Sequence, residues 1–293
     1  MPSVAERLTA ARRQLEAAGF PPADAALDAE VLARHLLGWD RADLIVRGRD
    51  PEPPGFSAQF DTVLARRTAH EPVAQIVGHR EFWGLDFEVT RDVLIPRPET
   101  EIIVEAVLAF AAAHPCRRIA DVGTGSGCLA VSIAHDLPSV IVTAVDVSPA
   151  ALEVARRNAA RHHVDDRVTL QQADVLAGVT GHFDLIVSNP PYVPEADAAS
   201  MQEDVVRYEP YLALFGGRSG FEVIERLFDQ SADHLASGGQ LIVEFGFGQA
   251  GQISSLAVKA GWRIVRVLND LQSIPRTIVL DRPSGDSAPQ THE

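Results

Sequence analysis

Asn189, Pro190, Pro191 and Tyr192 place a side-chain amide, two prolines and an aromatic ring directly after an apolar run. The run, residues 183–187, has the composition of a buried strand. A strand cannot continue through two prolines, because each lacks an N–H group and has a fixed φ. The chain must therefore leave the sheet here, exposing amide and carbonyl groups suited to binding a planar amide or amino group. Asn-Pro is also a common turn signal, so the motif alone leaves both interpretations open.

A second candidate site is a glycine-rich segment, made of Gly123, Thr124, Gly125, Ser126 and Gly127. Three glycines allow a tight turn against which a ligand can press, and the N–H groups of the following helix point outward. The spacing is G-x-G-x-G, whereas dinucleotide sites have G-x-G-x-x-G and triphosphate sites end in G-K-[ST]. We therefore expect a ligand without a pyrophosphate.

Two acidic residues follow the next two predicted strands. Asp146 stands 19 residues after Gly127, where a carboxylate can accept hydrogen bonds from both ribose hydroxyls. Asp174 stands where the adenine of such a ligand is expected. Asp146 could instead cap the helix that starts near Ser148, and Asp121 could stabilise the glycine-rich turn. The ribose interpretation is favoured for Asp146, while both interpretations stay open for Asp174.

The elements that must position these residues follow from hydrophobic periodicity. Residues 1–72 predict a small helical domain, with Ser3 and Glu6 forming a capping box at its start. Residues 73–93 alternate like two strands, 73–77 and 81–89, and predict a linking β-hairpin. A helix is expected at residues 101–113, and from residue 117 onward strands and helices take turns. This alternation predicts an α/β fold with a mostly parallel, doubly wound sheet.

Two further stretches have no predicted regular structure. Residues 195–211 form a long acidic segment directly after the Asn-Pro-Pro-Tyr motif and are expected to be a loop. Residues 283–293 are rich in Ser, Pro, Gly and acidic residues and predict a disordered tail.

Composition limits the class of protein. The chain has 293 residues, 46% of them hydrophobic, and a net charge of −14, so the protein as a whole repels polyanions. Two cysteines cannot form a disulfide framework, and nothing near them has zinc-ligand spacing, so we expect no metal site. No charged-then-apolar leader is present, and no apolar run approaches the roughly 18 residues that span a bilayer. We expect a cytoplasmic monomer that does not bind membranes.

Residues 117–280 resemble the class I S-adenosylmethionine-dependent methyltransferases. In that class an Asn-Pro-Pro-Tyr motif after the fourth strand is typical of methylation at an amide or exocyclic nitrogen. Such a nitrogen is a poor nucleophile, because its lone pair is delocalised. The Asn189 side-chain carbonyl and the Pro190 backbone carbonyl could each accept one hydrogen of the NH₂ group and stabilise positive charge as it develops. Tyr192 would pack on the flat face of the substrate.

Several further motifs resemble the HemK/PrmC family of protein-(glutamine-N5) methyltransferases, which modify peptide chain release factors. These motifs stand in the family's order along almost the whole chain and comprise Glu71-Pro72-Val73-Ala74-Gln75, Phe82-Trp83-Gly84, Ile95-Pro96-Arg97-Pro98-Glu99-Thr100-Glu101, Tyr208-Glu209-Pro210, Gly216-Gly217 and Glu244. A small N-terminal helical domain is also the family's architecture. The resemblance implies a methyltransferase domain at residues 94–282 and a substrate-docking role for residues 1–72.

The resemblance also implies the ligands and the site. The substrate would be the glutamine of the Gly-Gly-Gln loop of class 1 release factors, and the methyl donor S-adenosylmethionine. The implied catalytic residues are Asn189, Pro190 and Tyr192, and the implied substrate-binding residues are these three with Pro191. The cofactor-binding residues are the glycine-rich segment with Asp146, Asp174, Val175, Asn189 and Thr100. Val175 stands where the family often has an aromatic residue beside the adenine.

Two other functions are compatible with parts of the pattern. An adenine-N6 nucleic-acid methyltransferase uses the same tetrapeptide, but it needs a phosphate-binding surface and a way to flip the base. The acidic balance and the absence of a basic run argue against a nucleic-acid substrate. A non-enzymatic cofactor-binding protein is disfavoured, because the glycine-rich segment, Asp146 and the tetrapeptide are all intact.

Overall fold

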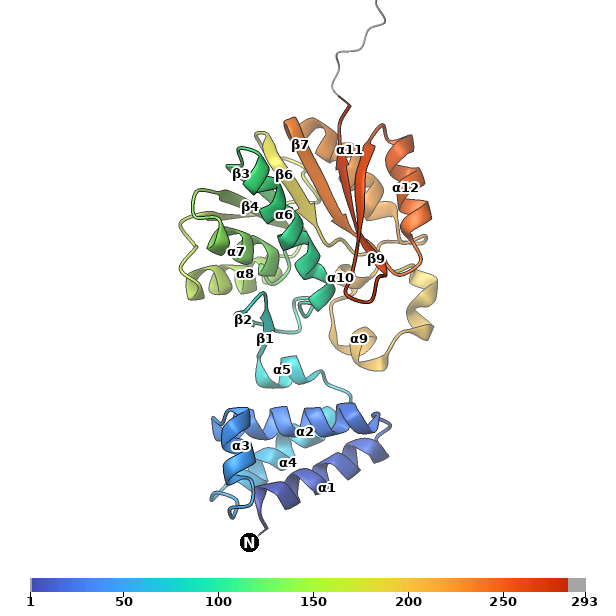
Figure 1. The fold of residues 1–293 in the computed structure, drawn as a ribbon. Helices are drawn as coiled ribbons and strands as arrows, with labels where there is room; N and C mark the ends of the chain where they lie inside the picture. The colour runs from blue at the N-terminus through green and yellow to red at the C-terminus, as the bar shows by residue number, and fades with distance from the viewer. Residues whose placement is uncertain (1, 284–293) are drawn as a thin grey trace, which may run out of the picture. The chain divides into compact units, whose positions relative to one another are not determined.

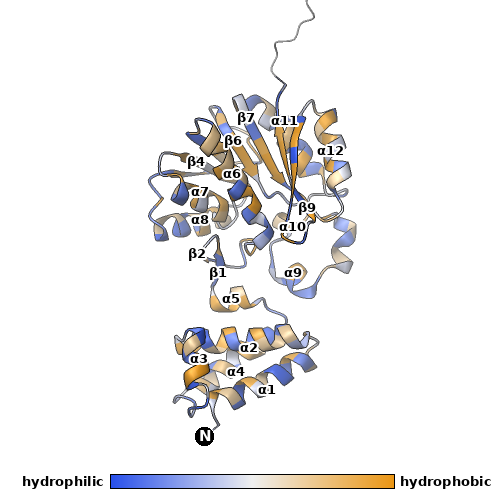
Figure 2. Cartoon of the chain, viewed as in Figure 1, coloured by the Kyte–Doolittle hydropathy of each residue, from blue (hydrophilic) through white to orange (hydrophobic). Residues whose placement is uncertain are grey.

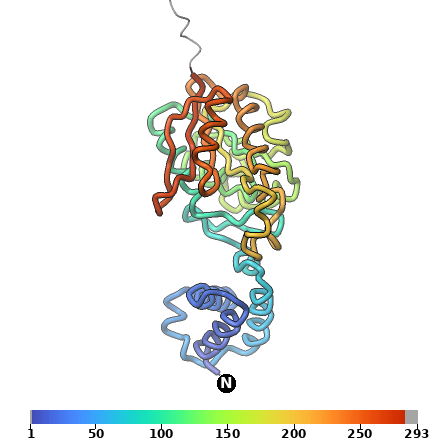
Figure 3. Tube along the Cα trace, turned by 90° about the vertical axis from the view of Figure 1, so that its right-hand side faces the viewer, coloured from blue at the N-terminus to red at the C-terminus, as the bar shows by residue number. Residues whose placement is uncertain are grey.

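The computed structural model describes residues 2–283 and divides into two compact units (Figure 1). The helical unit comprises Met1–His79 and Gln202–Tyr208, and the sheet unit comprises Arg80–Met201 and Glu209–Glu293. Residues 284–293, most of the predicted tail, lie outside the described part. Residues 202–208 thus belong to the helical unit, although the segments before and after them in the sequence belong to the sheet unit. Figure 3 traces the chain along its Cα atoms.

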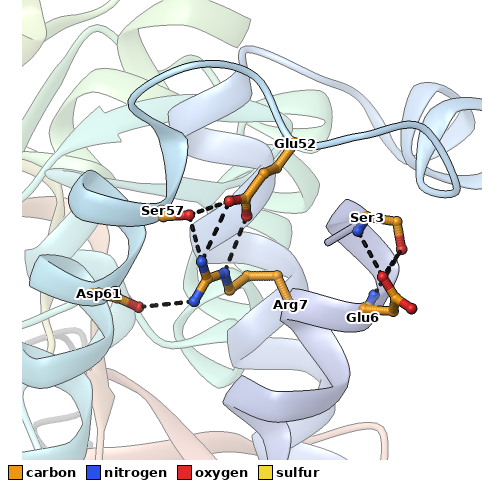
Figure 4. Close-up of polar contacts among 6 residues, drawn as sticks. All are labelled: Ser3, Glu6, Arg7, Glu52, Ser57 and Asp61. Carbon is orange, nitrogen blue, oxygen red and sulfur yellow. Dashed lines mark hydrogen bonds and ion pairs between the residues drawn. The ribbon is translucent and has the colours of Figure 1, made fainter. Parts of the chain in front are cut away.

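The helical unit packs its helices around a small apolar core. Leu15, Leu32 and Phe60 are fully buried in that core. The predicted capping box is present, since the Ser3 hydroxyl accepts from the Glu6 N–H group and the Ser3 N–H group donates to the Glu6 carboxylate (Figure 4). The helices are α1 (Val4–Ala17), α2 (Pro22–Leu37), α3 (Arg41–Arg47), α4 (Phe56–Thr68), α5 (Val73–Val77) and, from the returning segment, α9 (Glu203–Tyr208).

Polar contacts tie the start of this unit to α4. The Arg7 guanidinium on α1 bonds Glu52, with Nε 3.1 Å from Oε2, and also contacts Ser57 and Asp61 (Figure 4). Deeper in the unit, Arg67 is 7% exposed and donates to the Asp28 carboxylate over 2.7 Å. A buried carboxylate and guanidinium need one another, because an unpaired charge away from water is costly.

The prediction of a strand at residues 73–77 is wrong, because this segment is α5. A helix places Val73, Ile76 and Val77 on one face toward the core of the helical unit. Pro72 precedes the helix and Gly78, at φ 84°, ends it. A two-stranded sheet does follow, but its strands are β1 (His79–Phe82) and β2 (Leu85–Glu88). Its turn is therefore at residues 83–84, not at residues 78–79.

The sheet unit confirms the predicted α/β class. Its seven strands have the order β5-β4-β3-β6-β7-β9-β8. The first five of these are parallel to one another, and β9 is antiparallel to both β7 and β8. The strands are β3 (Arg118–Val122), β4 (Ile141–Asp146), β5 (Val168–Gln172), β6 (Phe183–Ser188), β7 (Leu235–Glu244), β8 (Arg263–Asn269) and β9 (Pro275–Asp281). The helices are α6 (Glu101–Ala113), α7 (Cys128–Asp136), α8 (Pro149–Arg161), α11 (Glu222–His234) and α12 (Ala250–Lys259), after the short η1 (Pro98–Thr100).

The inner strands of the sheet, such as β3 and β6, are buried on both faces, which explains their continuous apolar runs, whereas the edge strand β8 is mostly exposed (Figure 2). In β6, Leu185 and Val187 pack in one core cluster with residues of α6 and α7. The intervening Ile186 packs in the other cluster with residues of α11 and α12. Both clusters lie within the sheet unit and hold the strand ends in place.

Two boundaries differ from the sequence prediction. The stretch 195–211, expected to be a loop, contains η2 (Glu195–Ser200), α9 and the start of α10 (Tyr211–Leu214). β7 begins at Leu235 rather than near residue 240, because Leu235 already pairs with Phe183 before a register shift. No helix among the described residues is long and apolar enough to cross a membrane.

Candidate active site

A cavity of about 830 Å³ lies in the sheet unit beside the carboxyl ends of β3, β4 and β6. This edge is where open α/β sheets bind ligands. The cavity brings together most of the predicted site residues: Thr100, Gly123, Thr124, Gly125, Ser126, Asp146, Asp174, Val175, Asn189, Pro190 and Pro191.

Hydrogen bonds to the Asp121 carboxyl group stabilise the glycine-rich turn. Its Oδ2 atom accepts from the Thr124 hydroxyl over 2.6 Å and from the Ala130 N–H group over 3.1 Å. Burial raises the pKa of Asp121 to about 7, and its Oδ1 atom is buried with no hydrogen-bond partner. Asp121 itself is fully buried and does not line the cavity, so it acts on the site through the turn.

Gly127 is the exception within the turn, because it is not among the residues that line the cavity. It has φ 80°, and a Cβ atom there would lie 3.1 Å from the Cβ of Ala155 on α8. The absence of a side chain at Gly127 thus allows close packing of α8, and the structure places this predicted cofactor residue behind the cavity wall.

Asp146 ends β4 with both carboxylate oxygens directed at backbone N–H groups. Oδ2 accepts from Gly125 and Oδ1 from Ser148, each over 2.9 Å. Each oxygen retains a lone pair for a further donor. Burial raises the pKa of Asp146. The carboxylate therefore organises the turn and lines the cavity, whereas the N-cap of α8 is Ser148, whose hydroxyl accepts from the Ala151 N–H group.

Asp174 and Val175 form the wall beyond Asp146. Asp174 is exposed and pairs with Arg226, whose Nη1 atom lies 2.7 Å from Oδ2. Val175 is buried and has φ 57°, a conformation that is strained for a β-branched residue. Both residues line the cavity.

The Asn-Pro-Pro-Tyr turn is held by hydrogen bonds on both sides. At its start, the Ser188 hydroxyl donates to the Val122 carbonyl over 2.7 Å. At its end, Gln249 donates to the Tyr192 carbonyl over 2.9 Å and Val193 to the Leu214 carbonyl over 3.0 Å. The prolines break the strand as predicted, and the chain then forms an isolated bridge to Phe215.

Asn189 is oriented by Thr100. Its Nδ2 atom donates to the Thr100 hydroxyl over 2.9 Å. Within the described residues neither the Asn189 Oδ1 atom nor the Pro190 carbonyl accepts a hydrogen bond. Both residues line the cavity, so the turn offers it two acceptor oxygens.

Tyr192 is the tetrapeptide residue that does not line the cavity. Its ring packs with the core cluster of α11 and α12, and a Cβ atom on Gly246 would lie 3.0 Å from its Cδ2 atom. Burial raises its pKa, and the Glu244 carboxyl group adds to the effect. The ring therefore stabilises the turn from behind in this structure.

Sequence reasoning missed two parts of the site. Leu212, Ala213 and Phe215 line the cavity from the segment that pairs with the turn. Glu244, interpreted from the sequence as a strand end, is 2% exposed, and its Oε2 atom is buried with no hydrogen-bond partner among the described residues. The only sequence signal for either part was the resemblance, because the contacts join segments far apart in the chain.

These features define a class of protein. A glycine-rich turn without phosphate-binding spacing, a ribose-type carboxylate and paired acceptor oxygens fit an adenosine ligand that carries a methyl group. The fold and site are those of a class I S-adenosylmethionine-dependent methyltransferase. Among the described residues, no three His, Cys, Asp or Glu side chains are placed to hold a metal ion.

Comparison with known proteins identifies the family. A Methyltransferase small domain matches residues 100–209, and a PrmC N-terminal domain matches residues 6–78. The release factor glutamine methyltransferase of Koribacter versatilis is 41% identical over 94% of this chain and 96% of its own length. That of Cereibacter sphaeroides is 41% identical over 96% of this chain and 99% of its own. The chain belongs to the release factor glutamine methyltransferase family, which confirms the resemblance and the methyltransferase prediction.

Solved structures agree on the fold. A methyltransferase from Pyrococcus furiosus is 23% identical over 75% of this chain and 98% of its own, with a TM-score of 0.52. The human Mettl16 catalytic domain, in complex with the MAT2A 3'UTR hairpin 6, is 16% identical over 78% of this chain and 84% of its own, with a TM-score of 0.58. At these identities the similarity concerns the fold alone.

Proposed function

We propose that this protein transfers a methyl group from S-adenosylmethionine to the side-chain amide nitrogen, N5, of the glutamine in the Gly-Gly-Gln loop of class 1 release factors. The observation that carries the proposal is the pair of acceptor oxygens on Asn189 and Pro190 at the cavity. A primary amide has two N–H donors in one plane, and two acceptors match them.

Bound S-adenosylmethionine supplies an electrophilic methyl group on a sulfonium that leaves as a neutral thioether. The Asn189 and Pro190 oxygens would each accept one N–H of the glutamine amide and so direct its lone pair toward the methyl carbon. As the N–C bond forms and the S–C bond breaks, positive charge develops on nitrogen, and the two oxygens stabilise it. A proton then leaves the nitrogen, so an anionic amide is never required. Holding the reacting atoms about 3 to 3.5 Å apart supplies much of the rate.

The remaining residues of the site would bind the cofactor. Asp146 would accept hydrogen bonds from the ribose hydroxyls, because each of its carboxylate oxygens retains a lone pair. Asp174 and Val175 would lie beside the adenine. The glycine-rich turn would contact the donor through its backbone. Tyr192 would contact the substrate amide only after its ring moved from its packed position, so its direct catalytic role depends on that movement.

We further propose that the protein acts as a cytoplasmic monomer and that the helical domain, residues 1–72, helps to dock the release factor. The net charge of −14 disfavours a nucleic-acid substrate. Adenine-N6 methylation of nucleic acid is therefore not the favoured function.

A methyl-transfer assay tests the proposal. Purified release factor should accept radiolabelled methyl groups from S-adenosylmethionine, and a Gly-Gly-Ala version of the factor should not. Asn189→Ala should abolish transfer and leave cofactor binding largely intact, whereas Asn269→Ala, at an exposed position on β8, should have no effect. Labelling of duplex DNA or RNA in place of the factor would overturn the proposal.

A further inference from the structure

The side chain of Gln249 joins the loop after β7 to the end of the Asn-Pro-Pro-Tyr turn. Gln249 stands directly before α12. Its Oε1 atom accepts from the Gly246 N–H group over 2.8 Å, and its Nε2 atom donates to the Tyr192 carbonyl over 2.9 Å. The Gln249 N–H group also donates to the Gly246 carbonyl over 3.1 Å. Two hydrogen bonds therefore fix Gln249 to the loop after β7, and a third holds the turn.

Each partner of the Gln249 amide has only one hydrogen-bonding role. The Gly246 N–H group can only donate, and the Tyr192 carbonyl can only accept. An amide carries one acceptor oxygen and one donor nitrogen, so one orientation satisfies both partners and the flipped orientation satisfies neither. A carboxylate of the same shape could accept from Gly246, but it would set a negative charge against the Tyr192 carbonyl oxygen. The two contacts together therefore require glutamine rather than glutamate.

Close packing around Tyr192 leaves little room for this end of the turn to shift. A Cβ atom added to Gly246 would lie 3.0 Å from the Tyr192 Cδ2 atom. A Cβ atom added to Gly220 would lie 2.5 Å from the Tyr192 carbonyl oxygen. The ring of Tyr192 thus packs against one glycine, and its carbonyl is close to a second glycine and bonded to Gln249.

The contact at Tyr192 acts on the Pro190 carbonyl because the backbone between them is stiff. Pro190 and Pro191 each have a φ fixed by the proline ring, so few torsions can change between the two carbonyls. At the start of the turn, the Ser188 hydroxyl donates to the Val122 carbonyl over 2.7 Å. The turn is thus anchored on both sides of the Pro190 carbonyl, which itself accepts no hydrogen bond within the described residues.

We propose that Gln249 is a positioning residue that fixes the end of the turn and so holds the Pro190 carbonyl where it accepts from the substrate amide. The proposal rests on the proposed amide methylation and adds a residue on which that geometry depends. Gln249 is not among the residues that line the cavity. It therefore acts through Tyr192 and touches neither the glutamine nor the cofactor.

Kinetics of methyl transfer test the proposal with a matched pair of substitutions. Gln249→Glu removes the donor to Tyr192 and keeps the acceptor for Gly246. Gln252→Glu makes the same chemical change at an exposed position on α12. An acidic group at the start of a helix interacts favourably with the helix dipole, so Gln249→Glu should leave α12 folded.

Gln249→Glu should lower kcat for release factor about 10- to 100-fold, because a misplacement of about 1 Å can cost about 100-fold. The KM for release factor and the dissociation constant for S-adenosylmethionine should change much less than kcat. Gln252→Glu should leave all three unaltered. Equal kcat values in the two variants would overturn the proposal, and so would a loss of cofactor affinity as large as the loss of kcat.

A spectroscopic measurement does not depend on the substrate. Of the three tyrosines, Tyr192 alone precedes a valine. Labelling the tyrosine carbonyl carbon with ¹³C and the valine nitrogen with ¹⁵N therefore marks the peptide bond between Tyr192 and Val193 selectively. The carbonyl resonance should move in Gln249→Glu and in Gln249→Met, which also lacks the donor, and should stay in place in Gln252→Glu.

Gln249→Met also serves if Gln249→Glu fails to fold. A Tyr192 carbonyl resonance that is insensitive to both substitutions of Gln249 would overturn the proposal. A resonance that moves as expected, in a protein that does not methylate release factor, would support the positioning of the turn and refute only the proposed function.

Discussion

Gly216 should be indispensable to the geometry of the catalytic turn. It is buried beside the turn and lines the cavity, and an added Cβ atom would lie 2.4 Å from the Pro191 carbonyl oxygen and 2.4 Å from the Gly220 carbonyl oxygen. Both neighbours are backbone atoms, so neither can rotate away. Its own φ is not in the left-handed region, so the objection to a side chain is purely steric.

The size of the effect follows from the required displacement. Contacts below 3.0 Å essentially never occur for a Cβ atom, so each carbonyl would have to move away by at least 0.6 Å. Pro191 follows the Pro190 carbonyl, one of the two acceptors. A misplacement of about 1 Å can lower a rate about 100-fold. We expect Gly216→Ala to lower kcat by about 10- to 100-fold and the free energy of unfolding by about 1 to 3 kcal/mol, as for overpacking.

Gly251→Ala is the matched control. Gly251 is exposed on α12, and no atom lies within 4 Å of its added Cβ. That change should leave kcat unaltered and raise stability by up to about 1 kcal/mol, because alanine favours the helix. Kinetics of methyl transfer to release factor and urea unfolding would measure both effects. A Gly216→Ala protein with kcat within threefold of the parent and unchanged stability would refute the steric argument.

Three further predictions concern single side chains. Asp146→Ala should weaken S-adenosylmethionine binding by about 10- to 100-fold in calorimetry, because hydrogen bonds to a charged group are lost. An unaltered affinity would show that Asp146 does not bind the cofactor. Glu244 has a pKa raised by burial from 4.5 to about 7, so the folded protein binds the proton more tightly and stability from this group falls as the pH rises from about 4.5 through 7. Glu244→Gln should therefore gain on the parent by up to about 3 kcal/mol across that window, and a gain that does not change with pH in urea unfolding would contradict this. Arg67→Met should destabilise the protein by about 3 to 5 kcal/mol, since it leaves the Asp28 carboxylate buried without its partner, whereas Arg13→Met, at an exposed position, should cost almost nothing; equal unfolding midpoints would argue against the buried pair.

The parts of the site that follow from local chemistry were predictable. Two consecutive prolines end β6 whatever surrounds them, and the glycine-rich turn needs residues that tolerate positive φ. The alternation of strand-like and helix-like segments likewise indicated a mostly parallel sheet, because a helix between two strands allows them to run in the same direction. The family, and with it the glutamine substrate, came from the resemblance rather than from these patterns.

The errors fall where contacts between distant segments outweigh local preference. Residues 73–77 alternate like a strand, but a helix buries Ile76 in the core of the helical unit. The local pattern was compatible with two outcomes, and the neighbouring segments selected one. Gly127 does not line the cavity, and an added Cβ atom there would lie 3.1 Å from the Cβ of Ala155, so its contact with the cofactor stays a prediction.

By itself, the sequence determined that a strand ends at Asn189 beside a nucleoside-type turn, because proline and glycine act on their own backbone. Only the tertiary structure decided what each group there does. It packed the Tyr192 ring against the core and joined Asn189 to Thr100, 89 residues away. The direction of a hydrogen bond depends on every group that shares it, and the fold alone brings those groups together.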